Sequence, residues 1–225
     1  MEWAKRIFDF LGSIICHQLP DRTLLVGGSH LPFCARDTGI YMGLFVSFTY
    51  ILFKKRLKSD KMPDIITSIV LCLFTVPLIF DGFTSYVGIR GTTNQIRLFT
   101  GALCGFSLPF FIIPALGFKI KERNTKPVLE SLWELPFILA ILLLTCILIL
   151  KTDLVPWLLI SGILIFSFLF LFFILSYVVV VRLRSKENSA RSGKERFINI
   201  CLSCGAAFIV LVVLYAVPRI IYRYR

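Results

Sequence analysis

Two thiols, two imidazoles and a carboxylate lie within one short stretch near the start of the chain. Residues 16–41 read CHQLPDRTLLVGGSHLPFCARDTGIY and include both histidines of the protein. Zinc takes thiolate, imidazole and carboxylate ligands in tetrahedral sites, and iron accepts them as well. The stretch therefore predicts a zinc or iron site whose ligands are Cys16, His17, Cys34 and Asp37.

The spacing of these residues allows them to meet. Cys34 and Asp37 are three positions apart, so they share one face at the start of a helix. Between Cys16 and Cys34 the chain contains Gly27, Gly28 and two prolines, which allow it to fold back on itself. Two other interpretations stay open. The two cysteines could form a disulfide on an extracytoplasmic face, or both could be small buried apolar residues.

A second polar group follows the second apolar run of the sequence. Asp81 comes directly after PLIF, and a carboxylate at the end of an apolar helix needs water, an ion partner or a ligand. If the next helix starts near Ile89, then Arg90, Asn94 and Arg97 fall on one stripe that can meet Asp81. The group could act as an ion-pair clamp that fixes helix register. It could instead bind a phosphate, a carboxylate or a lipid headgroup.

If the two groups form one site, each predicted residue has a role. The catalytic residues are then Asp81, Arg90 and Arg97, with Asp81 as the base for a metal-bound water. The substrate-binding residues are Gln18, Asn94 and Arg97. This hypothesis requires the thiol group and the acid–arginine group to share a membrane face and to touch.

The elements that must position these residues are membrane helices. The chain has 225 residues, of which 57% are hydrophobic and 17% charged, and its mean hydropathy is +0.83. These values exclude a soluble globular domain, a disordered chain and a disulfide-stapled miniprotein. They indicate an all-α polytopic membrane bundle, a single integral membrane domain over residues 1–225. Six apolar runs predict transmembrane helices at 38–53, 65–80, 96–118, 132–150, 155–181 and 197–217.

Residues 1–37 form an N-terminal segment ahead of spans one to three (38–118), and spans four to six occupy 132–217. The first 15 residues are apolar on one face but too short and too charged to cross, which predicts an interfacial helix. Spans one and three carry small-residue motifs, Gly39-x-x-x-Gly43 and Gly101-x-x-x-Gly105, which let two helices approach closely. We therefore expect spans one to three to form a tight group around the polar residues.

The distribution of basic residues predicts the orientation in a cell membrane. Loops one, three and five hold most of the 25 Lys and Arg residues, so the positive-inside rule places them in the cytoplasm. Both termini are then extracytoplasmic, although the basic tail PRIIYRYR argues the other way. The formal net charge of +12 follows from this topology and from attraction to anionic lipids. No motif supports nucleic-acid binding.

The motifs CHQ–P–R and C–A–R–x–T–G–I–Y–x–G resemble those of an uncharacterised family of small prokaryotic membrane proteins, Domain of Unknown Function 2085. The stretch DGFTSYVGIRGTTNQIRLFTG is similar to the family's third motif, with Ser85 in place of Gln and Thr93 in place of Ser. The resemblance covers about residues 14–105. It implies a membrane location and a shared polar site but no reaction. The implied site residues are Cys16, His17, Gln18, Cys34, Asp37, Asp81, Arg90, Asn94 and Arg97.

One departure from the family pattern bears on the chemistry. The family's second motif usually reads CARCTGIY, whereas this chain has CARDTGIY with Asp37 in place of the second cysteine. The substitution weakens a redox hypothesis that needs a CxxC pair. It matters less for zinc, because carboxylate oxygen is an accepted zinc ligand.

These patterns predict a metal-capable polar site at the extracytoplasmic ends of spans one to three. For an enzyme, we expect metal-assisted hydrolysis or transfer on a small or lipid-linked anion, with the lipid bilayer as surroundings. One alternative is a small-solute or ion transporter or channel that uses Asp81, Arg90 and Arg97. Another is a structural or accessory membrane subunit. Cys201-Leu-Ser-Cys204 is expected to serve helix packing rather than redox chemistry.

Overall fold

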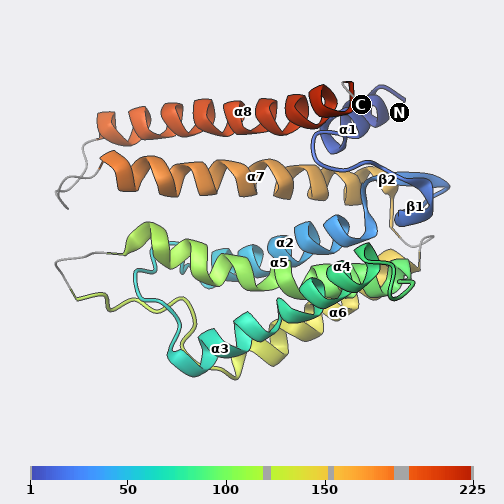
Figure 1. Ribbon diagram of the computed structural model, residues 1–225. Coiled ribbons are helices and arrows are strands. Elements are labelled where there is room, and N and C mark those ends of the chain that lie inside the picture. Colours follow the sequence, from blue (N-terminus) through green and yellow to red (C-terminus); the bar gives the residue numbers. More distant parts are fainter. Residues whose placement is uncertain (1, 119–122, 152–154, 185–192, 224–225) are drawn as a thin grey trace.

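The structure is a computed structural model that describes residues 2–118, 123–151, 155–184 and 193–223, and it is mostly helical (Figure 1). Parts of the basic third and fifth loops, residues 119–122 and 185–192, lie outside the described residues. The helices are α1 (Glu2–Gly12), α2 (Ala35–Phe53), α3 (Ile65–Leu73), α4 (Val76–Tyr86), α5 (Asn94–Gly117), α6 (Glu134–Leu150), α7 (Trp157–Arg184) and α8 (Gly193–Arg223). A single 3-10 turn, Pro20–Arg22, precedes the strands β1 (Thr23–Val26) and β2 (Ser29–Cys34).

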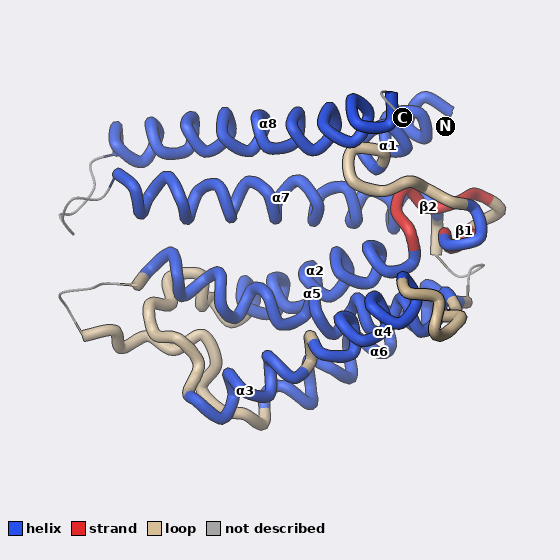
Figure 2. Tube along the Cα trace, viewed as in Figure 1, coloured by secondary structure: helices blue, strands red, loops and turns tan. Residues whose placement is uncertain are grey.

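The long helices form one bundle, in which consecutive passes of the chain run in opposite directions. In Figure 1, α2, α5, α7 and α8 lie roughly parallel to one another, while the α3–α4 pair and α6 tilt across them. The β-hairpin, α1 and both ends of the chain lie at the same end of this bundle (Figures 1 and 2). Side-chain contacts fix this end: Asn94 Nδ2 donates to Asp21 O, Trp157 Nε1 donates to His30 O, and the rings of Phe10 and Tyr215 lie 5.8 Å apart.

Within the described residues, four helices are long and apolar enough to cross a membrane. They comprise residues 65–86, where α3 and α4 count together, together with 94–117, 157–184 and 195–217. Helix α6 is apolar but has only 17 residues, fewer than the about 20 that a span needs. Helix α2 does not qualify either, because Arg36 and Asp37 in its first turn lower the mean hydropathy of its 19 residues.

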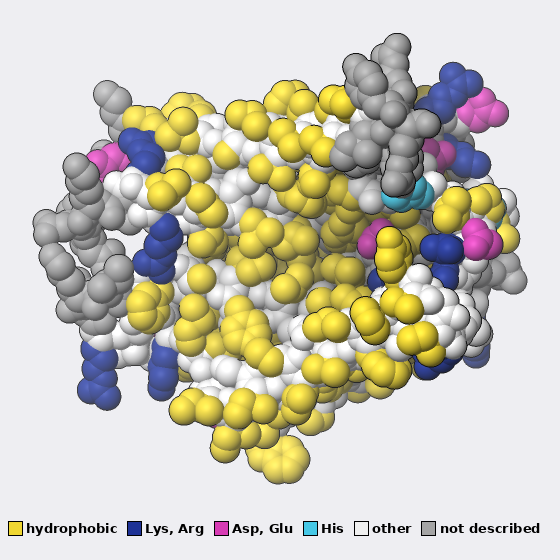
Figure 3. Space-filling view, viewed as in Figure 1, with side chains coloured by type: hydrophobic (Ala, Val, Ile, Leu, Met, Phe, Trp, Pro, Cys, Tyr) yellow, Lys and Arg dark blue, Asp and Glu magenta, His cyan; other side chains and the backbone are white. Residues whose placement is uncertain are grey.

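The surface of the bundle matches a membrane environment. In the space-filling view of Figure 3, hydrophobic side chains cover the middle of the visible face, and most charged side chains lie toward the two ends. Large apolar side chains such as Ile65, Phe83 and Phe208 are more than half exposed. Such exposure is favourable in a multi-pass membrane protein, because lipid and not water contacts these side chains.

Glycines bring α2 and α5 into close parallel contact. A Cβ atom at Gly39 would collide with the carbonyl oxygen of Leu98, and one at Gly105 would collide with that of Ile40. Gly43 and Gly101 face backbone atoms of the partner helix in the same way. The predicted pairing of the two small-residue motifs is therefore confirmed, and it sets the α2 side chains beside the first turns of α5.

The β-hairpin corrects the prediction of an all-α chain. Strands β1 and β2 pair antiparallel, with Val26 opposite Ser29 across a two-residue turn. Gly27 and Gly28 have φ angles of +54° and +75°, which glycine adopts readily and which the twisted two-residue turn of a hairpin requires. The Gly-Gly pair between two apolar runs was thus a hairpin signal and not only a sign of flexible chain.

The predicted second span is interrupted and extends further than expected. Pro77 lies in the first turn of α4 and cannot donate the backbone hydrogen bond that would join this turn to α3. The helix then continues past Phe80 to Tyr86, so Asp81 lies inside α4 rather than at its end. The next helix also differs from the prediction, because α5 begins at Asn94 and not near Ile89. Arg90 therefore lies in the connection before α5 and not on the predicted helical stripe.

A charged network closes the end of the bundle opposite the hairpin. Glu134 Oε2 accepts hydrogen bonds from Tyr50 Oη at 2.5 Å and from Arg56 Nη1 at 2.6 Å. Arg56 also pairs with Glu130 at 2.9 Å. These bonds join the last turn of α2 and the loop after it to the start of α6 and the segment before it. Cys201 and Cys204, the CxxC pair, are exposed on α8.

Candidate functional site

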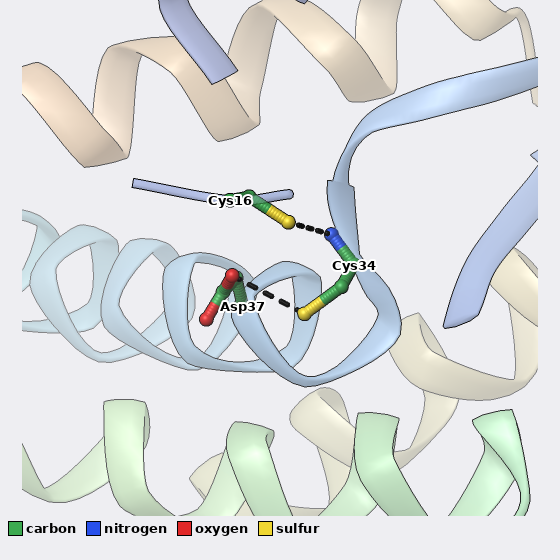
Figure 4. A group of neighbouring side chains, drawn as sticks. All are labelled: Cys16, Cys34 and Asp37. Atoms are coloured by element: carbon green, nitrogen blue, oxygen red, sulfur yellow. Dashed lines mark hydrogen bonds between the residues drawn. The ribbon is translucent and has the colours of Figure 1, made fainter. Parts of the chain in front are cut away.

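Cys16, Cys34 and Asp37 come together at the start of α2 (Figure 4). One ligand atom from each residue lies within 4.8 Å of those of the other two. Cys34 Sγ donates to Asp37 Oδ2 at 3.2 Å, which confirms that residues 34 and 37 share a face of the helix start. The residues come from three pieces of chain: Cys16 from the segment after α1, Cys34 from the end of β2, and Asp37 from the first turn of α2.

Gln18 holds the Cys16 segment against the hairpin. Its side-chain Nε2 donates to the carbonyl oxygens of Asp9, at 2.8 Å, and Pro32, at 2.9 Å. Its backbone has a φ of +51°, which is unusual for a residue other than glycine. Gly12 allows the approach, because a Cβ there would collide with Pro32 O. Gln18 thus holds the segment that carries Cys16, and its substrate-binding role stays a prediction.

The surroundings of the two thiols give them different proton affinities. Interaction with the Cys34 thiol is the main cause that lowers the pKa of the Cys16 thiol, and backbone N–H groups of Gln18 and Cys34 act in the same direction. These N–H groups donate to Cys16 Sγ at 3.4 and 3.2 Å. The pKa of Cys34 is raised by its interaction with Cys16, by burial and by the nearby Asp37 carboxylate. Of the two thiols, Cys16 therefore loses its proton more readily than Cys34.

The two histidines lie outside this group. Both His17 and His30 are exposed, and the group of mutually close ligand atoms in the described chain contains neither of them. All seven cysteines of the protein are free thiols in the structure. The structure thus brings together three of the four residues that the sequence predicted as metal ligands.

Asp81 forms the centre of the second polar group. Its carboxylate side chain is only 2% exposed. Oδ2 accepts from Arg36 Nη2 at 2.6 Å, while Oδ1 accepts from Arg90 Nη2 at 3.2 Å and from Thr92 Oγ1 at 2.6 Å. Of the predicted partners, Arg90 is confirmed. Arg36 and Thr92 were missed, although Arg36 stands beside Asp37 in the quoted CARD motif.

Arg97 and Asn94 do not join Asp81 through a hydrogen bond. Asn94 Nδ2 donates to Asp21 O at 3.1 Å and ties the start of α5 to the turn before β1. Arg97 is 9% exposed, and its Nε has no hydrogen-bond partner in the described structure. Arg22 and Arg36 are the positive groups that act most strongly on its charge.

The thiol group and the acid–arginine group lie side by side at the hairpin end of the bundle. Arg36, which holds Asp81, directly precedes Asp37, which accepts from Cys34. The positive charge of Arg36 lies close enough to act on the Asp37 carboxylate, and Cys34 lies close enough to act on the Arg97 guanidinium group. The two groups are thus in electrostatic contact through consecutive residues of α2.

Helices of this length and apolarity, with charged groups at the bundle ends, define a multi-pass membrane protein. Residues 16–111 match the family described as a predicted membrane protein, Domain of Unknown Function 2085, and the chain belongs to this family. The matched part contains both polar groups, together with the hairpin, α2, α3, α4 and most of α5.

Two archaeal relatives are similar to this half of the chain. An uncharacterised protein of Methanocaldococcus jannaschii is 36% identical over 102 residues, which are 45% of this chain and 64% of that protein. An uncharacterised protein of Methanothermobacter thermautotrophicus is 37% identical over 94 residues, 42% of this chain and 80% of that protein. No solved structure is significantly similar to the chain.

Proposed function

We propose that the chain spans the membrane six times, with both termini and the polar groups on the extracytoplasmic side. From α2 onward, with α3 and α4 counted together, each helix runs in the opposite direction to the one before it, and the basic loop 54–61 lies at the end opposite the hairpin. In this arrangement the lipid bilayer surrounds α3, α4 and α8, while α2 crosses inside the bundle. The exposed side chains of Trp3, Ile7 and Phe10 share one face of α1, which fits a helix lying on the membrane surface.

At the centre of the proposed function is a divalent metal ion, zinc or iron, bound by Cys16, Cys34 and Asp37. The observation that carries this proposal is the convergence of two sulfur atoms and a carboxylate within 4.8 Å. Around tetrahedral zinc, two sulfur ligands at about 2.3 Å from the metal lie about 3.8 Å apart, so small side-chain movements suffice. Three protein ligands leave one coordination position for water or substrate, which is the arrangement of catalytic zinc sites.

The chemistry that this arrangement supports best is metal-assisted hydrolysis or transfer on a small or lipid-linked anion. A bound zinc ion would supply a polarised water or polarise the anion itself. The Arg36 and Arg97 guanidinium groups would attract and orient the negative charge beside the ion. Both oxygens of Asp81 already accept hydrogen bonds, so in this proposal Asp81 positions Arg36 instead of acting as a base.

One observation favours a structural role as the second candidate. The Asp81 carboxylate receives three hydrogen bonds from two arginines and a threonine, which joins α2, α4 and the segment before α5. Fixing the helix register of an accessory subunit would be a sufficient role for such a group. A solute path along Asp81 has less support, because its side chain is nearly inaccessible.

Metal analysis of protein purified without a histidine tag tests the proposal. We expect about one equivalent of zinc or iron per chain, lost in Cys34→Ser and kept in the matched variant Cys72→Ser, whose thiol is exposed on α3. Metal-free wild-type protein with a Cys16–Cys34 disulfide would refute it. Equal metal content in all three proteins would place the metal elsewhere and would also refute it.

A further inference from the structure

Two arginine side chains at the hairpin end have buried nitrogen atoms without partners. The Nε atoms of Arg36 and Arg97 are buried, and neither makes a hydrogen bond within the described part of the chain. Arg97 is 91% buried as a residue, since its exposed fraction is 9%. A buried donor atom without a hydrogen-bond partner is unfavourable, which points to an acceptor group that would complete this environment.

The carboxylates of this region are engaged elsewhere. Asp81 is shared between Arg36 and Arg90, and Asp21 lies 3.5 Å from Arg22. Asp37 receives the Cys34 thiol. Arg97 forms no ion pair with any carboxylate that the structure describes. Its strongest electrostatic neighbours are the like charges of Arg22 and Arg36.

The donors that remain define the chemistry of the missing group. Arg97 can offer its Nε and Nη atoms, and Arg36 offers Nε after giving Nη2 to Asp81. The exposed Arg22 lies near enough to add a third positive charge. Several donors on separate arginines favour an anion with several acceptor oxygens and more than one negative charge. A phosphate group has three such oxygens and a charge of about −1.5 to −2.

We propose that Arg97 and Arg36 bind a phosphate group, carried either by free phosphate or by a lipid headgroup. The inference deepens the proposed function, on which it rests for its role, by naming phosphate as the anion beside the metal ligands. Arg97 is the main binding residue, and Arg90, which pairs with Asp81, contributes little. Both arginines lie at the hairpin end of the bundle, which the proposed topology places on the extracytoplasmic side.

Titration of the full-length protein with inorganic phosphate, read by calorimetry and by the shift in melting temperature, tests this assignment. We expect saturable binding that Arg97→Gln weakens by about tenfold to a hundredfold, the range for one or two charge-assisted hydrogen bonds. The matched variant Arg90→Gln removes the same charge from the same end and should change the affinity by less than about threefold. If the Arg97→Gln variant does not fold, Arg97→Lys, which keeps the charge, replaces it. The phosphate affinity of Arg97→Lys should lie between those of Arg97→Gln and Arg90→Gln.

A second arm separates the two sources of phosphate. Protein in nanodiscs of phosphatidylcholine is compared with protein in nanodiscs that also contain phosphatidic acid, and lipid retained through detergent extraction is counted. Retention of phosphatidic acid that depends on Arg97 identifies a lipid headgroup, whereas binding of inorganic phosphate alone identifies the free ion. Absence of both, or equal losses in Arg97→Gln and Arg90→Gln, overturns the proposal. Metal content is measured in the same samples, so failure of phosphate binding with metal retained is distinct from failure of the metal site.

Discussion

Arg36 Nη2 lies 2.6 Å from Asp81 Oδ2, although the two residues are 45 positions apart in the chain. This ion pair joins the first turn of α2 to α4 and places Asp37, the next residue, beside the thiols of Cys16 and Cys34. The metal-capable group and the arginine group therefore share one structural support. A change in either is expected to affect the other through α2.

The first prediction concerns the Arg36–Asp81 pair. Arg36→Gln leaves a buried carboxylate with weaker donors, so we expect the free energy of unfolding to fall by about 1–3 kcal/mol. Arg90→Gln should cost less than about 1 kcal/mol, because the Arg90 side chain is 45% exposed and its bond to Asp81 is longer. Thermal or denaturant unfolding in detergent measures both. Equal costs, or no reduction of the Arg36→Gln cost in an Asp81→Asn background, would contradict the assigned geometry.

The second prediction concerns the contact between α2 and α5. Gly39→Ala places a methyl group against the backbone of Leu98 and Ala102, which cannot move aside without separating the helices. We expect the free energy of unfolding to fall by about 1–3 kcal/mol. The control is Gly162→Ala on α7, where a Cβ meets open space and helix propensity favours alanine by about 1 kcal/mol. Similar melting temperatures for the two variants would show that the close packing is wrong.

The third prediction concerns pH. Because the folded protein lowers the pKa of the Cys16 thiol, its thiolate contributes stability above the ordinary value of 9.0, and this contribution is lost as pH falls through the lowered pKa. Thiolate absorbance is followed in metal-stripped protein that keeps only Cys16 and Cys34. We expect one thiol to ionise below pH 9.0 and the other above it, with Cys34→Ala moving the Cys16 midpoint upward. Two indistinguishable midpoints near 9.0 would disprove the asymmetry.

The fourth prediction concerns the network at the opposite end. Arg56→Gln leaves Glu134 with weaker donors and should lower the unfolding free energy by about 1–3 kcal/mol. Tyr50→Phe removes one hydrogen bond to the same carboxylate and should cost about 0.5–1.5 kcal/mol. Lys58→Gln, on an exposed residue of the same loop, serves as the control and should be nearly neutral. Additive effects of Arg56→Gln and Tyr50→Phe would argue against a shared network.

The parts of the structure that the sequence predicted well depend on local spacing. The separation of Cys34 and Asp37 predicts a shared helix face, and the two glycine motifs predict the contact between α2 and α5. Both follow from the helical repeat, which a short stretch of sequence contains in full.

The parts that were missed depend on where elements begin and on pairings across the chain. The start of α5 at Asn94 and not near Ile89 moves Arg90 into a connection and separates it from Arg97. The role of Arg36 depends on α4 packing against α5, the close partner of α2, so that Asp81 comes within reach of Arg36, and no local pattern shows this. The Gly-Gly turn did carry a hairpin signal, but the surrounding apolar composition favoured an all-α interpretation.

The most direct test of the central claim is X-ray absorption spectroscopy at the zinc edge of the tag-free protein. The account predicts two sulfur ligands at about 2.3 Å and one or two oxygen ligands at about 2.0–2.2 Å. Cys16→Ser should remove one sulfur from the spectrum, because Cys16 and Cys34 are the two thiols of the group. A metal bound only by nitrogen and oxygen ligands, or protein that takes up no metal, would contradict the account.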